Sequence, residues 1–209
     1  MSFNLRRREL LVMFAAMSAQ IPWSSTRAQS QPKSLRQGQS LISRDRWDRL
    51  RSLASIHLGP AADVIHLIVF FDPNCPWCAQ LWKKLYATIP PSPHASAWIP
   101  IAYLSDSSDG KALAMQRAAD PAKALADNFE RFDMVARSGG IEPIGDPSPR
   151  EREGQLASNS AWQSLFPASP LIVYRSRDGG TYVQVGMPGA DDFAALLAEL
   201  PPGTMSTYP

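Results

Sequence analysis

The clearest hydrophobic pattern in the chain is an almost unbroken apolar run at residues 64–71, VIHLIVFF. Its β-branched and aromatic side chains, without polar alternation, predict a strand covered on both faces, as at the centre of a parallel sheet. His66 interrupts the run. Because no second histidine or cysteine stands at ligand spacing, we interpret it as a core or strand-edge residue, not as a metal ligand.

A turn, a helix and a second strand follow this run. Residues 72–74, DPN, are typical of a turn, and residues 79–88 carry apolar side chains on one helical face. Pro76 suits the first position of that helix, where no N–H is needed. Residues 97–104, AWIPIAYL, predict the next strand, with Pro100 at a bulge or an edge. Strand, helix and strand together predict a βαβ unit.

The alternation of strands and helices stops over about residues 109–150. Residues 111–119 and 121–137 predict two helices, the second beginning at Pro121. Residues 139–149 are rich in glycine and proline and predict a loop. We therefore expect a helical insertion in this part of the chain.

The alternating pattern resumes after the insertion. Residues 150–166 predict a weaker helix, and residues 171–174 and 181–185 predict two strands joined by a hairpin turn at 178–180, DGG. Residues 191–200 predict an amphipathic closing helix. These elements indicate an α/β fold, with a central mixed sheet flanked by helices.

The first 28 residues have the features of an export signal peptide. Arginines at 6–8 precede a short apolar stretch at 10–16, and residues 26–28, TRA, end in a small residue as cleavage sites do. Paired arginines also fit a twin-arginine signal, so the Sec route and the twin-arginine route both stay open. The alternative is an amphipathic first helix of the mature fold.

The segment after this leader is polar. Residues 29–60 hold a lead-in with Pro32 and Gly38, followed by an exposed linker helix at 40–58 in which arginines interleave with aspartates. At the other end of the chain, residues 201–209 predict a flexible tail.

Composition narrows the class of protein. The chain has 209 residues, 44% hydrophobic and 19% charged, which suits one folded domain with small appendages. No apolar run reaches the roughly 18 residues of a spanning helix, which argues against an integral membrane protein. The leader carries four of the 21 lysines and arginines and one of the 19 acids, so the remainder has a net charge of −1. This charge gives no indication of a nucleic-acid partner.

The only two cysteines of the chain, Cys75 and Cys78, stand between the buried strand and the following helix. A helix N-terminus offers free N–H groups and the positive end of the helix dipole, and both favour a thiolate. We therefore expect Cys75, exposed at the helix mouth, to form a mixed disulfide with a substrate. Cys78, one turn further in, should be more buried, less ionised and able to resolve that disulfide.

Three other interpretations compete with redox chemistry. A structural disulfide over four residues would contribute about 1.9 kcal/mol by chain entropy, against about 3 kcal/mol over fifteen, so it fits poorly here. A zinc site would need ligands from His57, His66 or His94, none of which is paired with another. Two ordinary buried cysteines are the third possibility. We favour redox chemistry without a cofactor or a metal.

The segment FDPNCPWC at 71–78, followed by LWK at 81–83, resembles the active-site segment of DsbG and DsbC, periplasmic thiol–disulfide interchange proteins of thioredoxin fold. SPLIVY at 169–174 resembles their cis-proline loop and its strand, and VGMP at 185–188 resembles the matching DsbG segment. The matches run in the family's order and include its helical insertion. The resemblance implies a thioredoxin-like catalytic domain over residues 61–200.

The resemblance also implies roles for four residues of the site. Cys75 would be the nucleophile and Cys78 the resolving thiol. The bond between Ser169 and Pro170 would be cis, and its loop would face the cysteines and bind an extended substrate peptide through backbone groups.

Pro76 and Trp77, between the cysteines, would tune the site and contact the substrate. Strongly oxidising relatives carry a histidine where this chain has Trp77, so we expect a reductase or isomerase type rather than a strong oxidase. Residues 29–58 leave no room for the family's N-terminal dimerisation domain, which favours a monomer.

The function that follows is disulfide exchange in the periplasm with unfolded or misoxidised exported proteins, supported by a disulfide reductase or oxidase in the membrane. Two alternatives stay open. A thioredoxin-fold chaperone or assembly factor would hold clients with its cysteines incidental. A metal-handling protein would bind copper or zinc through the same thiols.

Overall fold

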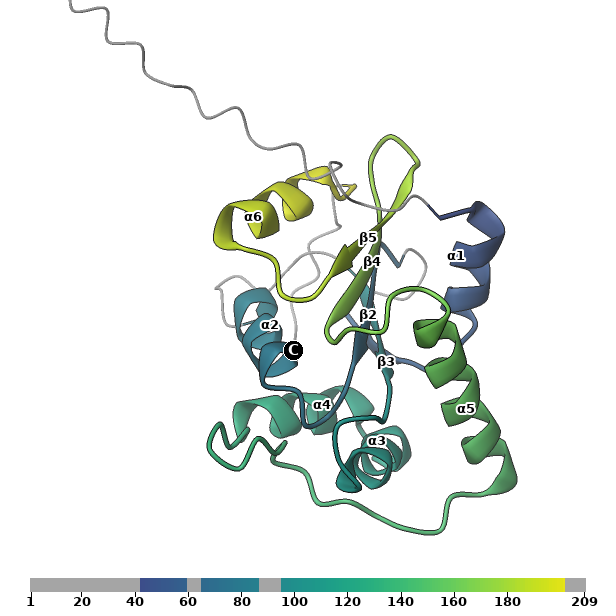
Figure 1. The fold of residues 1–209 in the computed structure, drawn as a ribbon, viewed down its shortest axis with the longest axis vertical. Coiled ribbons are helices and arrows are strands. Elements are labelled where there is room, and N and C mark those ends of the chain that lie inside the picture. Colours follow the sequence, from purple (N-terminus) through teal and green to yellow (C-terminus); the bar gives the residue numbers. More distant parts are fainter. Residues whose placement is uncertain (1–41, 60–64, 87–94, 202–209) are drawn as a thin grey trace, which may run out of the picture. The chain divides into compact units, whose positions relative to one another are not determined.

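Among the residues that the structure describes, a five-stranded mixed sheet lies at the centre, in the order β1-β3-β2-β4-β5 (Figure 1). The computed structural model describes residues 42–59, 65–86 and 95–201. The expected leader at 1–28, the lead-in at 29–39 and the tail from residue 202 onward lie outside the described residues. The strands are β1 (Ile56–Leu58), β2 (Leu67–Phe71), β3 (Ser96–Pro100), β4 (Leu171–Arg175) and β5 (Thr181–Val185).

The apolar run seen in the sequence forms the middle strand of this sheet. All five residues of β2 are buried, and β2 pairs parallel with β3 and antiparallel with β4. Helix α2 (Pro76–Tyr86) connects β2 to β3 and so completes the expected βαβ unit. The hairpin of β4 and β5 is also as expected, and its turn contains Gly179 with a φ of 83°.

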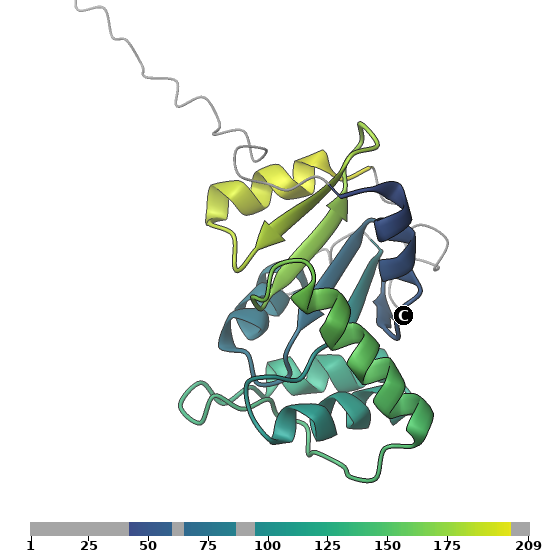
Figure 2. The same ribbon diagram turned by 45° about the vertical axis from the view of Figure 1, so that its right-hand side comes forward.

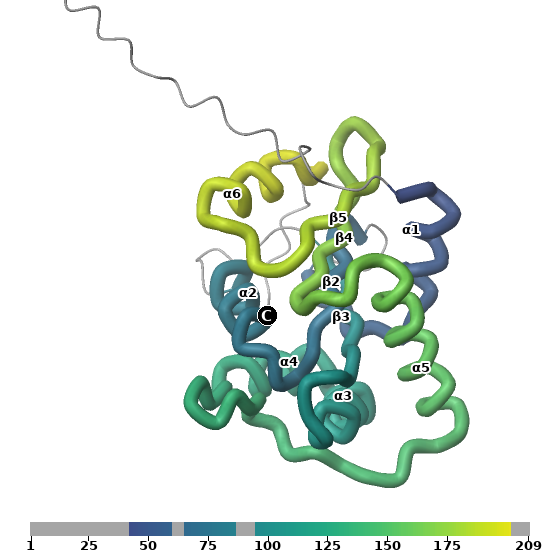
Figure 3. Tube along the Cα trace, in the orientation of Figure 1, coloured from purple at the N-terminus to yellow at the C-terminus, as the bar shows by residue number. Residues whose placement is uncertain are grey.

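Helices cover both faces of the sheet. The strands β2 and β4 turn alternate side chains into two hydrophobic clusters. One cluster lies under α2, α4 (Pro121–Glu130) and α6 (Ala190–Glu199), and the other lies under α1 (Arg44–Arg51) and α5 (Pro149–Gln163). Figure 2 shows α1 and α5, the helices on the second face of the sheet, and Figure 3 traces the chain through both helical layers.

An aromatic cluster joins the helical insertion to the sheet and to α2. The rings of Phe71, Trp98 and Phe129 lie with centroids 5.5 to 5.9 Å apart, and Trp82 packs on the same group at 5.5 Å from Trp98. Aromatic pairs at such distances contribute about 0.5–1.5 kcal/mol each beyond the burial of their area. The insertion is therefore part of the core and not a surface appendage.

The insertion contains the two predicted helices, α3 (Ser107–Arg117) and α4. Pro121 begins α4, as predicted, and Asp120 caps it by accepting a hydrogen bond from the Lys123 amide at 2.9 Å. The prediction that this helix continues to residue 137 was wrong. The chain instead turns back in a loop closed by two backbone hydrogen bonds between Asp133 and Ser138.

The prediction of one exposed helix over residues 40–58 was also wrong. The helix α1 ends at Arg51, and its Trp47 is only 1% exposed because it packs in the core. Ile56 and Leu58 point inward while His57 points outward, so this stretch forms β1, antiparallel to β3. Over only three residues, the alternation of buried and exposed positions in a strand cannot be distinguished from the spacing of apolar residues in a helix.

Pro100 is the last residue of β3 and pairs with Phe71 of β2, whereas the pairing of β3 with β1 ends at Trp98, so Pro100 lies at a local edge of the sheet, as predicted. Beyond it, the chain passes Tyr103 and Leu104 and enters α3. Among the described helices, none combines the length and the apolar character needed to cross a membrane.

Candidate functional site

The two cysteines lie where β2 passes into α2. The Cys75 amide donates to the Asp72 carbonyl at 3.0 Å, which closes the turn, and Pro76 begins the helix. The helix geometry brings the Cys78 amide to 3.4 Å from the Cys75 sulfur. A free N–H of the first helical turn therefore donates to that sulfur, as the sequence predicted.

Both sulfurs are covered, and both cysteines are free thiols. Cys75 is 2% exposed and Cys78 is fully buried. The expectation of an exposed Cys75 was wrong, because the loop before β4 packs against its sulfur. The Ser169 carbonyl lies 3.4 Å from the Cys75 sulfur in this loop.

The peptide bond between Ser169 and Pro170 is cis, as the resemblance implied. This geometry brings Ser169 against both thiols, since its hydroxyl lies 3.0 Å from the Cys78 sulfur. The same hydroxyl accepts a hydrogen bond from the Asp72 amide at 3.2 Å. Pro170 is buried, and its carbonyl accepts a hydrogen bond from the Gly186 amide at 2.9 Å.

The two thiols differ in acidity. The pKa of Cys75 is lowered from 9.0 to about 7, first because the Cys78 side chain hydrogen-bonds to it. Burial opposes this shift, while the Ser169 side chain and the amides of Trp77 and Cys78 lower the pKa further. The pKa of Cys78 is raised well above 9.0, chiefly by burial and then by its hydrogen bond to Cys75. One sulfur is therefore prepared to attack, and the other holds its proton.

Exposed apolar side chains lie on the segments that carry the site. Trp77 is 54% exposed at the start of α2, while Pro76 is half-buried. Tyr103, Leu104 and Phe166 are also exposed, on the segments that follow β3 and precede the cis bond. The ring centroids of Tyr103 and Trp162 lie 4.7 Å apart, so Tyr103 packs against α5.

The carboxylate of Asp72 holds the turn in place but contacts neither sulfur. It accepts hydrogen bonds from the amides of Asn74, Tyr103 and Leu104 and from the Ser108 hydroxyl, at 2.8 to 3.0 Å. Asp63 and Asp72 are the acids nearest to the cysteines in the sequence. Asp63 lies outside the described residues, and Asp72 acts on the loop backbone.

Asn74 and Lys111 belong to the same buried cluster, and sequence reasoning missed both. Lys111 is 4% exposed and donates to the Asn74 amide oxygen at 3.0 Å. The one local signal for Asn74 is its place in the DPN turn. Nothing in the pattern of α3 distinguishes Lys111 from a surface lysine.

Within the described ranges, no three His, Cys, Asp or Glu side chains gather in a way that could hold a metal ion. His66 is half-buried beside the sheet, where its amide donates to the Ala95 carbonyl and its carbonyl accepts from the Arg175 amide. Burial and the neighbouring Arg175 charge lower its pKa.

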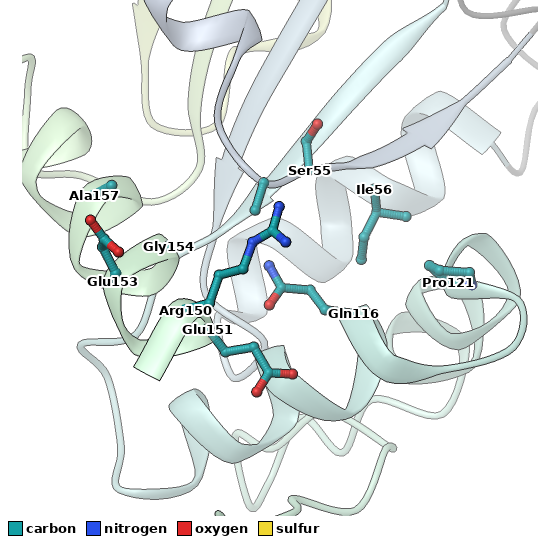
Figure 4. A pocket seen from close by; sticks show the side chains of 10 residues that line it. Ser55, Ile56, Gln116, Pro121, Arg150, Glu151, Glu153, Gly154 and Ala157 are labelled. Carbon is teal, nitrogen blue, oxygen red and sulfur yellow. The ribbon is translucent and has the colours of Figure 1, made fainter. Parts of the chain in front are cut away.

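A hollow of about 530 Å³ lies apart from the thiols, between the start of β1 and the ends of α3, α4 and α5. Figure 4 shows the Arg150 side chain reaching into it, with Gln116 opposite. The Glu151 carboxylate instead accepts hydrogen bonds from the Arg117 guanidinium at 2.8 Å. The hollow contains no cysteine or histidine among its lining residues, so the thiol chemistry is not located there.

Sequence comparison finds relatives of this chain among disulfide interchange proteins, although no protein-family model matches it. The thiol:disulfide interchange protein DsbG of Pseudomonas aeruginosa is 25% identical over 158 residues, which cover 75% of this chain. DsbG of Escherichia coli is 24% identical over 149 residues, or 69% of this chain. The matched parts span 60% and 57% of these two relatives, so the chain covers about three-fifths of their length.

Comparison of structures agrees on the fold. The catalytic domain of Proteus mirabilis ScsC superimposes with a TM-score of 0.52 at 19% identity, covering 74% of this chain and 94% of that domain. The chain is thus DsbG-like in sequence and thioredoxin-like in fold.

Proposed function

We propose that the protein is a thiol–disulfide oxidoreductase that acts on the cysteines of exported proteins. The observation that carries the proposal is the pair of unequal thiols, Cys75 with a pKa of about 7 and Cys78 with a raised pKa, both in contact with Ser169. Exchange needs one sulfur that ionises near neutral pH and a second that waits as a thiol.

The reaction has two displacement steps. The Cys75 thiolate attacks one sulfur of a client disulfide, which forms a mixed disulfide and releases the other client sulfur as a thiolate. Cys78 then loses its proton and attacks the Cys75 sulfur, which releases the second client sulfur. The client gains two electrons, and the protein ends with a disulfide between its own cysteines. Oxidation of a client runs through the same steps in reverse.

The site favours extended polypeptides as clients. The loop at Ser169 and Pro170 offers backbone groups beside Cys75, and strand-like addition reads backbone more than side chains. Trp77 and the exposed apolar residues around it supply contact area for unfolded or misoxidised proteins. We place the protein in the periplasm as a monomer, exchanging electrons with a disulfide reductase or oxidase in the membrane.

We favour a reductase or isomerase over a strong oxidase. A thiolate is stabilised here mostly by neutral hydrogen bonds, and Trp77 supplies no positive charge. The reduction potential of the Cys75–Cys78 couple tests the type. A value between about −180 and −270 mV supports the proposal, and one near −120 mV would assign an oxidase.

The exchange activity itself is tested on a disulfide-bonded client in the presence of a reductant. Cys75→Ser should abolish turnover, while Cys78→Ser should accumulate mixed disulfides visible on non-reducing gels. Ser160→Ala, on the exposed side of α5, is the matched control and should behave as wild type. Equal residual activity in both cysteine variants would refute the assigned roles.

The exposed apolar side chains at Trp77, Tyr103 and Phe166 favour a second candidate, a chaperone or assembly factor that holds clients without redox chemistry. A Cys75→Ala, Cys78→Ala double variant separates the two. The double variant is expressed in cells that lack the protein. Full restoration of the wild-type phenotype would support the chaperone, and failure to restore it would support the oxidoreductase.

A further inference from the structure

We propose that Lys111, a residue of the helical insertion, is a positioning residue for Cys75 and acts on it through Asn74. The inference deepens the proposed function and rests on it, because it concerns how the attacking thiol is held. It assigns to the insertion a part in the chemistry that the cysteine motif alone does not reveal.

The Lys111 ammonium is buried in a cage of acceptors. Its nitrogen lies 3.0 Å from the Asn74 amide oxygen, 2.7 Å from the Ser138 hydroxyl and 2.6 Å from the Gly139 carbonyl. An ammonium has three donors, and each finds an acceptor here. Two of these acceptors belong to the far end of the insertion, so Lys111 ties α3 and the loop after α4 to the turn before Cys75.

The Asn74 side chain is held at both of its polar atoms. Its oxygen accepts from Lys111 and from the Gly139 amide at 3.1 Å. Its nitrogen lies 2.8 to 3.1 Å from three hydroxyls, those of Ser105 just before α3 and of Ser107 and Ser108 in the first turn of α3. The residue immediately before Cys75 is therefore fixed by side chains that stand more than thirty positions away in the sequence.

The neighbouring residues of the turn are held in the same way. Asn128 of α4, which is fully buried, donates to the Pro73 carbonyl at 3.0 Å. The Asp72 carboxylate binds the Tyr103 and Leu104 amides. Each residue from 72 to 74 is thus anchored by the insertion or by the segment leading into it. Lys111 is the charged member on the insertion side of this network.

The burial of a cation here needs a reason beyond packing. Burial lowers the pKa of Lys111, and the charges that face it, Glu142 and Asp72, only partly offset this. Apolar residues of similar volume often replace buried charges with no loss of stability. A cation that bridges Asn74, Ser138 and Gly139 restrains the turn in a way that an apolar side chain cannot.

The test compares Lys111→Met with Lys123→Met. Lys123 makes an exposed ion pair with Asp127 within α4. Replacing Lys123 by methionine should therefore leave the thiols unaltered. The pKa of Cys75 is read from thiolate absorbance at 240 nm, with Cys75→Ser as the blank. We expect Lys111→Met to raise this pKa by about half a unit or more, which makes alkylation at pH 6 about threefold slower.

Coupling between the two residues tests the route. If Lys111 acts through Asn74, then Asn74→Ala should raise the pKa of Cys75 as well, and the double variant should show less than the sum of both shifts. Additive shifts, or no shift in either single variant, would overturn the inference. Ser138→Ala removes only one acceptor of Lys111 and provides a milder variant if Lys111→Met does not fold.

These measurements need no client and no turnover. If the pKa of Cys75 depends on Lys111 but the protein exchanges no disulfide, the proposed function is wrong and the positioning role stands. If exchange proceeds while the pKa of Cys75 is indifferent to Lys111, the positioning role is wrong and the proposed function stands.

Discussion

The hydroxyl of Ser169 lies 3.0 Å from the sulfur of Cys78, although 91 positions separate the two residues in the chain. The Ser169 side chain lowers the pKa of both thiols, because its hydroxyl can donate to a thiolate. The residue before the cis bond is thus in contact with the whole redox pair, and it provides the first of four tests.

Ser169→Ala should make both thiols less acidic. We expect the pKa of Cys75 to rise by about half a unit, since one stabilising hydrogen bond is lost. Thiolate absorbance across a pH titration of the reduced protein measures this. Ser160→Ala, which removes a hydroxyl on the exposed side of α5, is the matched control, and a Ser169→Ala titration identical to it would contradict the assignment.

Replacement of Cys78 by alanine and by serine should give different results for Cys75. The Cys78 side chain is the largest cause of the lowered Cys75 pKa. Alanine removes this donor, so the pKa should rise from about 7 toward 9.0, whereas serine keeps a donor and should preserve most of the shift. Iodoacetamide alkylation rates at pH 6 to 9 compare the two variants directly. Equal rates would show that the donor is not the cause.

The reduced protein should become more stable as the pH rises from 6 to 8.5. Folding depresses the pKa of Cys75 from 9.0 to about 7, so in this window the unfolded state binds more protons at that sulfur than the folded state. The stabilisation is almost absent at pH 6, grows as the pH passes through 7 and amounts to about 2 kcal/mol at pH 8.5.

Urea unfolding of the reduced protein at both pH values measures this term. Cys75→Ser lacks the titrating sulfur, so the pH-dependent gain of the wild type should exceed that of the variant. A wild-type gain no larger than that of Cys75→Ser would show that the Cys75 pKa is not depressed by folding.

Gly139→Ala should destabilise the fold and disturb the turn before Cys75. A methyl group at this buried position would collide with the Asn128 side chain and lie 2.5 Å from the Pro73 carbonyl. Overpacking of this kind costs about 1–3 kcal/mol. At Gly154, within α5, the space for a methyl group is open, so Gly154→Ala should stabilise by about 0.5–1 kcal/mol. Thermal or urea unfolding measures both, and equal effects at the two sites would contradict the packing argument.

Much of the fold could be predicted from sequence, because several elements carry strong local signals. The apolar run before the cysteines predicts β2, the DGG turn predicts the final hairpin, and Pro76 and Pro121 mark the starts of α2 and α4. In each case either a residue type restricts its own backbone conformation, or a pattern of apolar residues is long enough to identify the element.

The remaining features depend on contacts between distant segments. Ile56 and Leu58 form a strand only because β3 lies beside them. Cys75 is covered by a loop from residues near 169, which no local pattern reveals. The burial of Lys111 requires acceptors from two separate segments, the turn at Asn74 and the loop at Ser138 and Gly139, so its sequence neighbourhood resembles that of a surface lysine.

The contact between Cys75 and Ser169 has a consequence for biosynthesis. A ribosome that has just produced the cysteine pair must add more than ninety further residues before the loop that tunes it exists. Until then both thiols lack the Ser169 hydroxyl, which lowers the pKa of each. The full lowering of the Cys75 pKa is therefore reached only once the chain extends past Ser169 and this loop packs against the thiols.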